Sequence, residues 1–130
     1  VQTEFTNAER IRRDRLQAHA VEAAEQCGGT FVPEVDDLRP LSGVLGEWDP
    51  ARRILWPDEA LAGAGTTLEN AQRGPWAILI GPEGGFSPGE RTRLQGLDFV
   101  YPVSLGPRIL RADTAAVAAL TLWQTQLGDW

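Results

Sequence analysis

The stretch WAILIGPEGGFSPGE, residues 76–90, indicates the fold class of this chain. Its first five residues, 76–80, form an uninterrupted apolar run between Pro75 and Gly81. A short apolar run between turn residues is typical of a strand that is buried on both faces of a parallel sheet. We therefore predict a buried strand at this position.

Helix signals follow this strand directly. Ser87 can cap a helix, Pro88 suits the first helical position, and Glu90 completes a capping box. The pattern predicts a helix over residues 88–95 that ends at Gly96. The loop GPEGGF is then held between a strand and a helix.

The rest of the second half repeats this order. Residues 99–105 are predicted to form another strand, and Asp113 is predicted to cap a second helix. Five residues of that helix can face a core: Ala112, Ala116, Ala119, Leu120 and Trp123. The alternation of strands and helices predicts an α/β fold with a parallel sheet.

The first half carries weaker signals. Thr6 and Glu9 have capping-box spacing and predict a helix over residues 7–27. Its inward face would carry Leu16, Ala20, Ala23, Ala24 and Cys27, and an arginine cluster of Arg10, Arg12, Arg13 and Arg15 is either solvated surface or an RNA contact. Further along we predict a short strand at 31–35, a helical turn or two at 38–45, a strand at 53–56 and a loop at 58–74.

The length and composition fit one domain over residues 1–130, with 42% hydrophobic and 23% charged residues. Because no apolar run approaches the roughly 20 residues that span a bilayer, we expect no membrane segment. Cys27 is the sole cysteine, which excludes a metal site built from a cluster of cysteines. We expect Cys27 to be a buried small residue, and a lone thiol suits the reducing conditions of the cytoplasm. The chain contains no Met, so we expect another segment to precede Val1.

The charged residues exclude some functions. There is no Lys, so all 12 basic side chains are Arg, and 18 acidic residues give a net charge of −6. A Walker-type phosphate loop, which needs its lysine, is excluded. The acidic balance also disfavours an autonomous RNA-binding domain, because phosphate contacts normally require a basic surface.

The glycine loop after Ile80 is a candidate ligand site. Gly81, Gly84 and Gly85 let the backbone approach a ligand closely, at the carboxyl end of a strand where ligands bind in parallel sheets. Glu83 would repel a pyrophosphate, and the spacing is not GxGxxG, so a dinucleotide is disfavoured. S-adenosylmethionine carries a sulfonium cation and no phosphate, and suits this loop better. A turn that merely joins strand to helix is the alternative.

A second loop has the same design. Leu105, Gly106 and Pro107 leave the next strand in the same way, so the two loops could line one pocket. Arg108 and Arg111 follow. They either pair with acidic surface residues or bind a carboxylate or phosphate in bidentate fashion, and the sequence leaves both interpretations open.

Three segments resemble a known family. ILIGPEGGFSPGE at 78–90 and SLGPRILRADTAAVAAL at 104–120 closely resemble the two signature motifs of the ribosomal small-subunit methyltransferase E family. LQAHAVEAAEQCGGTFVPEV at 16–35 is similar to the segment that leads into the catalytic domain of that family. These enzymes belong to the SPOUT class and methylate N3 of a uridine in 16S ribosomal RNA of the small subunit.

The resemblance implies a SPOUT-type parallel sheet flanked by helices, with a C-terminal deep trefoil knot, an S-adenosylmethionine cofactor and a homodimer. It also implies a PUA-like β-barrel RNA-binding domain at the N-terminus, which has no counterpart in this chain. Where the family commonly has Glu, this chain has Asp113, and a catalytic role for that residue is doubtful. By motif match, the expected cofactor contacts are Ile80, Gly81, Glu83, Gly84, Gly85, Leu105, Gly106, Ile109, Leu110, Thr114 and Ala115.

Methylation at N3 requires the uracil imide to lose a proton, so a cation that stabilises the developing anion should help. We assign that role to Arg111 first and to Arg108 next, and expect an ordinary structural role for His19. Two alternatives are a non-catalytic RNA-binding or ribosome-assembly module with the same fold, and an enzyme that uses a different nucleotide.

Overall fold

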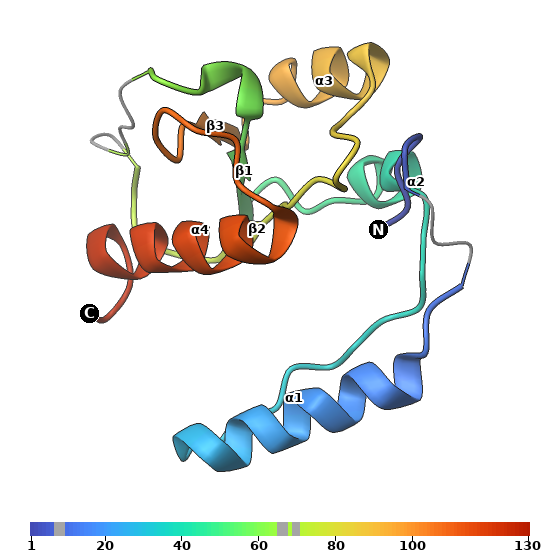
Figure 1. The fold of residues 1–130 in the computed structure, drawn as a ribbon, viewed down its shortest axis with the longest axis vertical. Coiled ribbons are helices and arrows are strands. Elements are labelled where there is room, and N and C mark those ends of the chain that lie inside the picture. The colour runs from blue at the N-terminus through green and yellow to red at the C-terminus, as the bar shows by residue number, and fades with distance from the viewer. Residues whose placement is uncertain (7–9, 65–67, 69–70) are drawn as a thin grey trace.

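The computed structural model describes residues 1–6, 10–64, 68 and 71–130 (Figure 1). Three strands form a parallel sheet in the order β2-β1-β3, and Leu55 of the central strand lies opposite Ile78 on one side and Tyr101 on the other. The prediction of an α/β fold with a parallel sheet is confirmed. The elements are α1 (Arg13–Cys27), α2 (Leu41–Gly46), β1 (Arg53–Pro57), the 3-10 helix η1 (Glu59–Leu61), β2 (Trp76–Ile78), α3 (Pro88–Gln95), β3 (Val100–Val103) and α4 (Ala112–Gln126).

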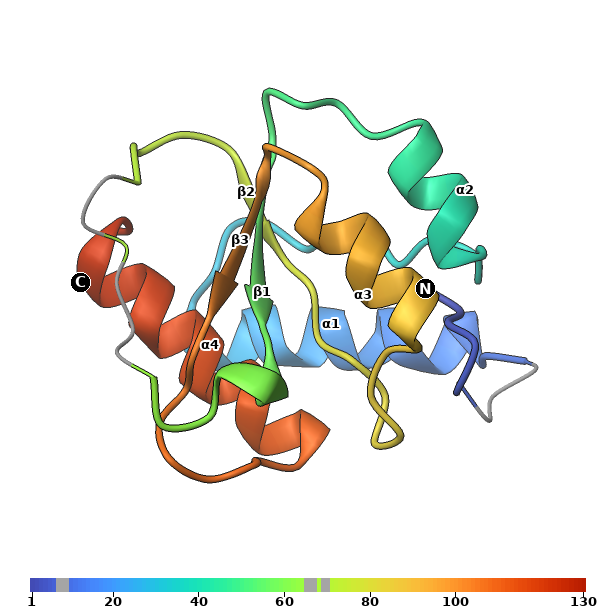
Figure 2. The ribbon, with the colours of Figure 1, turned by 90° about the horizontal axis from the view of Figure 1, so that it is seen from above.

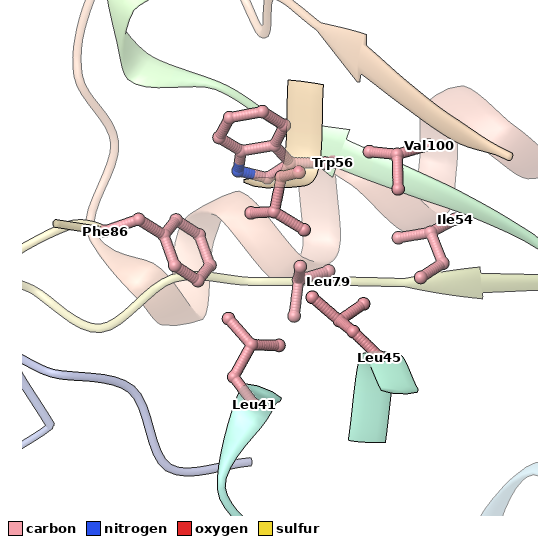
Figure 3. Packing of buried hydrophobic residues seen from close by; sticks show 8 residues of the cluster. Leu41, Leu45, Ile54, Trp56, Leu79, Phe86 and Val100 are labelled. Atoms are coloured by element: carbon pink, nitrogen blue, oxygen red, sulfur yellow. The ribbon is translucent and has the colours of Figure 1, made fainter. Parts of the chain in front are cut away.

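Helices cover both faces of the sheet. Helix α4 lies on one face, and α2 and α3 lie on the other (Figure 2). Strand β1 contributes side chains to the core on both faces of the sheet, because Ile54 and Trp56 point to one face and Leu55 points to the other. The layer beside α2 and α3 is built from Leu41, Leu45, Ile54, Trp56, Leu79, Phe86, Leu94 and Val100 (Figure 3). The layer beside α4 contains Leu55, Leu68, Trp76, Val103, Ala119 and Leu127.

The predicted strand at 76–80 is present as β2, but the prediction that it is buried on both faces and extends to residue 80 was wrong. The strand that is buried on both faces is β1. Strand β2 is shorter than predicted and lies at the edge of the sheet, with Ala77 and Ile78 half-buried. Residues 54–56 of β1 are almost completely buried. A central strand has neighbours on both sides, so its apolar run has no face left for solvent. Strand β3 also ends two residues before the predicted limit of 105.

The capping signals located α3 correctly. Its bounds match the prediction, and the capping box is present: the Glu90 amide donates to Ser87 Oγ at 3.3 Å, and the Ser87 amide donates to Glu90 Oε2 at 2.9 Å. The helix ends before Gly96, as expected.

Two predictions for α4 were wrong. The N-cap residue is Arg111, which makes no capping side-chain bond, while Asp113 lies within the first turn and accepts a hydrogen bond from the Thr114 amide at 2.8 Å. Of the residues expected to face the core, Ala119 is buried and Trp123 packs against the core layer, but Leu120 is 52% exposed. An all-round apolar helix gives no unique inward face, which is why the periodicity misplaced Leu120.

The prediction of a helix over residues 7–27 gave the wrong first residue and wrongly expected an inward apolar face to be buried. Helix α1 begins at Arg13, residues 10–12 are not helical, and the Thr6 hydroxyl accepts from the Thr3 amide instead of capping a helix. The predicted stretch 7–9, with Glu9, lies outside the described residues. Helix α1 lies apart from the sheet (Figure 1), and Ala24 is its one buried residue.

The apolar residues around α1 therefore lack a core. Leu16 is 43% exposed, Cys27 is exposed rather than buried, and the predicted strand at 31–35 is an irregular segment in which Phe31 is 77% exposed. Helical spacing of apolar residues predicts a helix but does not supply the surface on which it packs. The predicted helical turn at 38–45 begins only after Pro40, as α2. No helix in the described part of the chain has the length and apolarity needed to cross a membrane.

Candidate functional site

The segments that follow the three strands meet at one edge of the sheet (Figure 2). They are residues 58–62 after β1, 79–87 after β2 and 104–111 after β3. Together they line a cavity of about 510 Å³. The carboxyl edge of a parallel sheet is the usual place for a ligand, and the volume suits a small organic molecule.

The cavity brings most of the predicted site residues together. Both candidate catalytic arginines, Arg108 and Arg111, line it. Gly84 and Thr114 are not among its lining residues. The predicted cofactor contacts that do line it are Ile80, Gly81, Glu83, Gly85, Leu105, Gly106, Ile109, Leu110 and Ala115.

The first glycine loop depends on Gly85. This residue has φ +72°, a left-handed conformation that side chains rarely adopt, and a Cβ placed there would lie 2.6 Å from Oε1 of Glu59. Gly85 is thus favoured by the turn, and a side chain at this position would displace the carboxylate of Glu59. Gly81 instead allows the ring of Phe86 to pack closely, since its Cβ would lie 2.9 Å from Cε2 of that ring.

Gly84 faces the N-terminal segment rather than the cavity. A Cβ at this position would lie 3.1 Å from Cβ of Phe5. The same segment is held to α3, because the Glu4 amide donates to Glu90 Oε1 at 2.8 Å, and to α2, because Gln2 forms a parallel bridge with Pro40. The packing of residues 1–6 against this loop therefore explains why position 84 has no side chain.

The second loop presents its arginines at the mouth of the cavity. Ser104 is buried at its start, and its Oγ accepts from the Gly106 amide at 3.2 Å. Arg111 is 78% exposed and lies 4.0 Å from both Glu83 and Asp113. Screening by water makes such exposed pairs weak, so the guanidinium can exchange these partners for a ligand or RNA.

A third wall was missed by the sequence analysis. It is the segment from Trp56 to Ala62, and it is anchored by Asp58, whose side chain is 1% exposed. The carboxylate of Asp58 forms an ion pair with Arg91 of α3 at 2.7 Å, and the Arg91 guanidinium lies over the Trp56 ring at 5.5 Å. Asp58 Oδ1 also accepts from the Ala60 amide at 3.0 Å and so caps η1.

Backbone bonds join this third wall to the second glycine loop. The Asp58 amide donates to the Val103 carbonyl at 2.9 Å, and the Gly63 amide donates to the Gly106 carbonyl at 3.0 Å. The wall therefore contacts the first glycine loop through Glu59 at Gly85, and Gly63, directly after the wall, contacts the second loop at Gly106.

The cavity residues that sequence reasoning missed include Trp56, Pro57, Asp58, Glu59, Ala62, Phe86 and Arg91. A usable signal was present, since Asp58 and Glu59 directly follow a strand whose carboxyl end must lie at the same edge as the other two. Residues 58–74 were instead interpreted as a loop because they show little periodicity.

The chemistry of the cavity is mixed. Its apolar side is formed by Ile80, Leu105 and Leu110, and its polar side by carboxylates and arginines. The buried Asp58–Arg91 pair is internally neutral. In the described part of the chain no cluster of His, Cys, Asp and Glu has the arrangement of a metal site. The cavity can hold an organic ligand that combines an apolar ring with charged groups.

Comparison with known proteins agrees with this geometry. Residues 1–124 match the model of a family described as RNA methyltransferase domain. The chain belongs to this RNA methyltransferase family. This match and the curated relatives together confirm the resemblance to the ribosomal small-subunit methyltransferase E family.

Two curated relatives are named ribosomal RNA small subunit methyltransferase E. The protein of Buchnera aphidicola from Acyrthosiphon pisum is 47% identical over 117 residues, which cover 89% of this chain and 45% of the relative. The protein of Bacillus subtilis is 32% identical over 125 residues, covering 89% and 48%. The chain thus spans about half the length of these relatives.

Two solved structures share the fold and contain a ligand. A methyltransferase of Legionella pneumophila in complex with the cofactor SAM has a TM-score of 0.84 at 31% identity, covering 98% of this chain and 54% of that one. Ribosomal RNA small subunit methyltransferase E of Neisseria gonorrhoeae, bound to S-adenosyl methionine, has a TM-score of 0.77 at 28% identity, covering 92% and 49%. The arrangement of sheet and helices is therefore that of methyltransferases.

Proposed function

We propose that this chain is the catalytic domain of a methyltransferase that uses S-adenosylmethionine to modify N3 of a uridine in 16S ribosomal RNA. The observation that carries the proposal is the meeting of two glycine loops, each following a parallel strand, around one cavity of about 510 Å³. Relatives named for small-subunit ribosomal RNA and similar structures with bound cofactor support it. A ribosomal RNA substrate implies a cytoplasmic enzyme.

The residues present fit this cofactor. The apolar side of the cavity, with Ile80, Leu105 and Leu110, suits the adenine ring, and the carboxylates suit a molecule with positive charge and no phosphate. We assign the cofactor contacts to the lining residues Ile80, Gly81, Glu83, Gly85, Leu105, Gly106, Ile109, Leu110 and Ala115. Gly84 and Thr114 do not line the cavity, so the proposal that they contact the cofactor rests on the motif match alone.

The motifs at 78–90 and 104–120 extend the proposal to the SPOUT class, including its C-terminal trefoil knot. In such an arrangement both glycine loops belong to the knotted region, which is one of the rare exceptions to unknotted chain topology.

When bound, S-adenosylmethionine supplies an electrophilic methyl carbon on a sulfonium. Uracil N3 loses its proton to solvent and forms a bond to that carbon, while the carbon–sulfur bond breaks and leaves its electron pair on sulfur. The chain must align the reacting atoms and stabilise the negative charge on the imide. Arg111, exposed at the mouth of the cavity, is our candidate for the second task, with Arg108 beside it.

Deletion of the gene that encodes this chain tests the substrate. We expect mass spectrometry of 16S ribosomal RNA from the deletion strain to lack one N3-methyluridine that the parent strain contains. Complementation with the intact gene should restore it. An unchanged set of modified nucleosides would refute the proposed substrate.

Complementation with Arg111→Ala tests the catalytic residue. Loss of one charge-stabilising group should lower methylation on the order of 100-fold. Calorimetry on the variant should show unchanged affinity for S-adenosylmethionine, because Arg111 acts on the RNA base. Full restoration of the N3-methyluridine by this variant would remove the role.

We also propose a homodimer. Ile109, Val117 and Leu120 are 73%, 66% and 52% exposed, and they lie on or just before α4, beside the cavity. Exposed apolar residues gathered on one helix are typical of an interface. Sedimentation should give a dimer for the chain and a monomer for Val117→Asp, whereas a wild-type monomer at micromolar concentration would contradict the proposal.

A non-catalytic RNA-binding module with this fold is the second candidate. This candidate is supported by the pairing of a cavity arginine with an exposed carboxylate, as between Arg111 and Glu83. Such a pair can have a purely structural role and does not require that the chain catalyses a reaction. Calorimetry with S-adenosylmethionine, S-adenosylhomocysteine and NAD separates the candidates. Binding of the first two favours the enzyme, binding of NAD favours another nucleotide enzyme, and binding of none favours the module.

A further inference from the structure

Glu59 is a carboxylate on the third wall of the cavity. It begins η1, directly after Asp58, and Asp58 is fixed by its ion pair with Arg91 at 2.7 Å and by capping η1. Glu59 Oε1 reaches to within 2.6 Å of the position that a Cβ of Gly85 would occupy. The carboxylate therefore lies against the first glycine loop, at the wall of the cavity.

The charge of Glu59 has no counterion among the residues that the structure describes. Asp58 is paired with Arg91, and Glu83 lies 4.0 Å from Arg111, but Glu59 takes part in none of the ion pairs. It is exposed to the cavity that it lines. An unpaired carboxylate in a ligand cavity is available to bind a cation.

The cofactor of the proposed function offers two cations, a sulfonium and the ammonium of its methionine part. The sulfonium loses its charge as the methyl group leaves, so a carboxylate in contact with it would stabilise the bound substrate more than the transition state. Such a contact opposes catalysis. The ammonium keeps its charge throughout, and a contact with it anchors the cofactor without raising the barrier.

We propose that Glu59 is a specificity-determining residue that accepts hydrogen bonds from the ammonium group of the cofactor. The inference rests on the proposed function and adds a residue from the third wall of the cavity to the two glycine loops. It predicts that the cofactor and its demethylated product depend on Glu59 equally, because both carry the ammonium.

The test is calorimetry of the full chain and of Glu59→Gln with three ligands. These are S-adenosylmethionine, S-adenosylhomocysteine and 5′-S-(3-carboxypropyl)-5′-thioadenosine, which is S-adenosylhomocysteine without its amino group; weak binding is measured by competition. We expect Glu59→Gln to weaken the first two by about tenfold each, as for one charge-assisted bond. The affinity of the third should not change. Glu25→Gln, on α1, is the matched control and should bind all three like the wild type.

Each other outcome overturns the inference in a recognisable way. Weakening of all three ligands would mean that Glu59 contacts the ribose or supports the fold, and weakening of S-adenosylmethionine alone would mean a sulfonium contact. No weakening, or a greater loss in Glu83→Gln than in Glu59→Gln, would also refute it. If the wild type binds none of the ligands, the proposed function itself fails. Failure of the proposed function is thus distinguishable from failure of the role proposed for Glu59.

Discussion

At the scale of single residues, Gly85 satisfies two demands at once. Its φ of +72° forms the turn of the first glycine loop, and its lack of a side chain leaves room for Glu59. Gly28, at the end of α1, has the same φ of +72°, but nothing lies within 4 Å of where its Cβ would be. A comparison of substitutions at Gly28 and Gly85 therefore distinguishes the effect of backbone strain from the effect of displacing Glu59.

We predict that Gly85→Ala lowers the free energy of unfolding by about 1 kcal/mol through backbone strain and also displaces Glu59. Affinity for S-adenosylmethionine should fall, as measured by calorimetry. Gly28→Ala should show a similar loss in chemical denaturation with unchanged affinity. Equal affinities in the two variants would show that the contact between Glu59 and Gly85 is irrelevant to binding.

At the scale of elements, the Asp58–Arg91 pair joins the end of β1 to α3. The two residues are 33 positions apart, the carboxylate is 1% exposed, and the guanidinium also stacks on Trp56. Through this pair, helix α3 helps to hold the third wall of the cavity in place.

Removal of Arg91 leaves the carboxylate of Asp58, which is 1% exposed, as a buried charge without compensation. We therefore predict that Arg91→Ala lowers the free energy of unfolding by about 3 kcal/mol. Chemical denaturation of this variant, of Asp58→Ala and of the double variant measures the coupling. The double variant should be less destabilised than the sum of the two single variants. Additive losses would mean that the pair contributes no interaction of its own.

The elements that local signals specify could be predicted, and those that depend on distant partners could not. Helix α3 was located to the residue because its cap, Ser87 to Glu90, is a contact between neighbours in sequence. The two glycine loops were identified for the same reason. The third wall was missed because Asp58 gains its role from Arg91 on another element, and nothing periodic marks it. Likewise, the spacing of apolar residues in α1 could not tell that Leu16 would be 43% exposed.

At the scale of the whole molecule, the sheet order β2-β1-β3 brings three strand ends to one edge, while helices close both faces. The segments that follow these strands line the cavity. The chain is not suited to hold RNA alone, since it carries a net charge of −6. Cofactor binding and RNA binding are therefore separable properties.

We predict that the chain by itself binds S-adenosylmethionine but methylates small ribosomal subunits poorly, on the order of 100-fold below a full-length relative, because phosphate contacts supply much of the affinity for RNA. The comparison protein is the Bacillus subtilis relative, of which this chain spans 48%. Both are titrated with cofactor and then assayed on subunits from the deletion strain at two salt concentrations. Methylation by the chain should fall less steeply with salt than methylation by the relative, since fewer phosphate contacts release fewer counterions. If the chain alone matches its longer relative on subunits, its own acidic surface suffices for RNA, and the separation of the two binding properties is wrong.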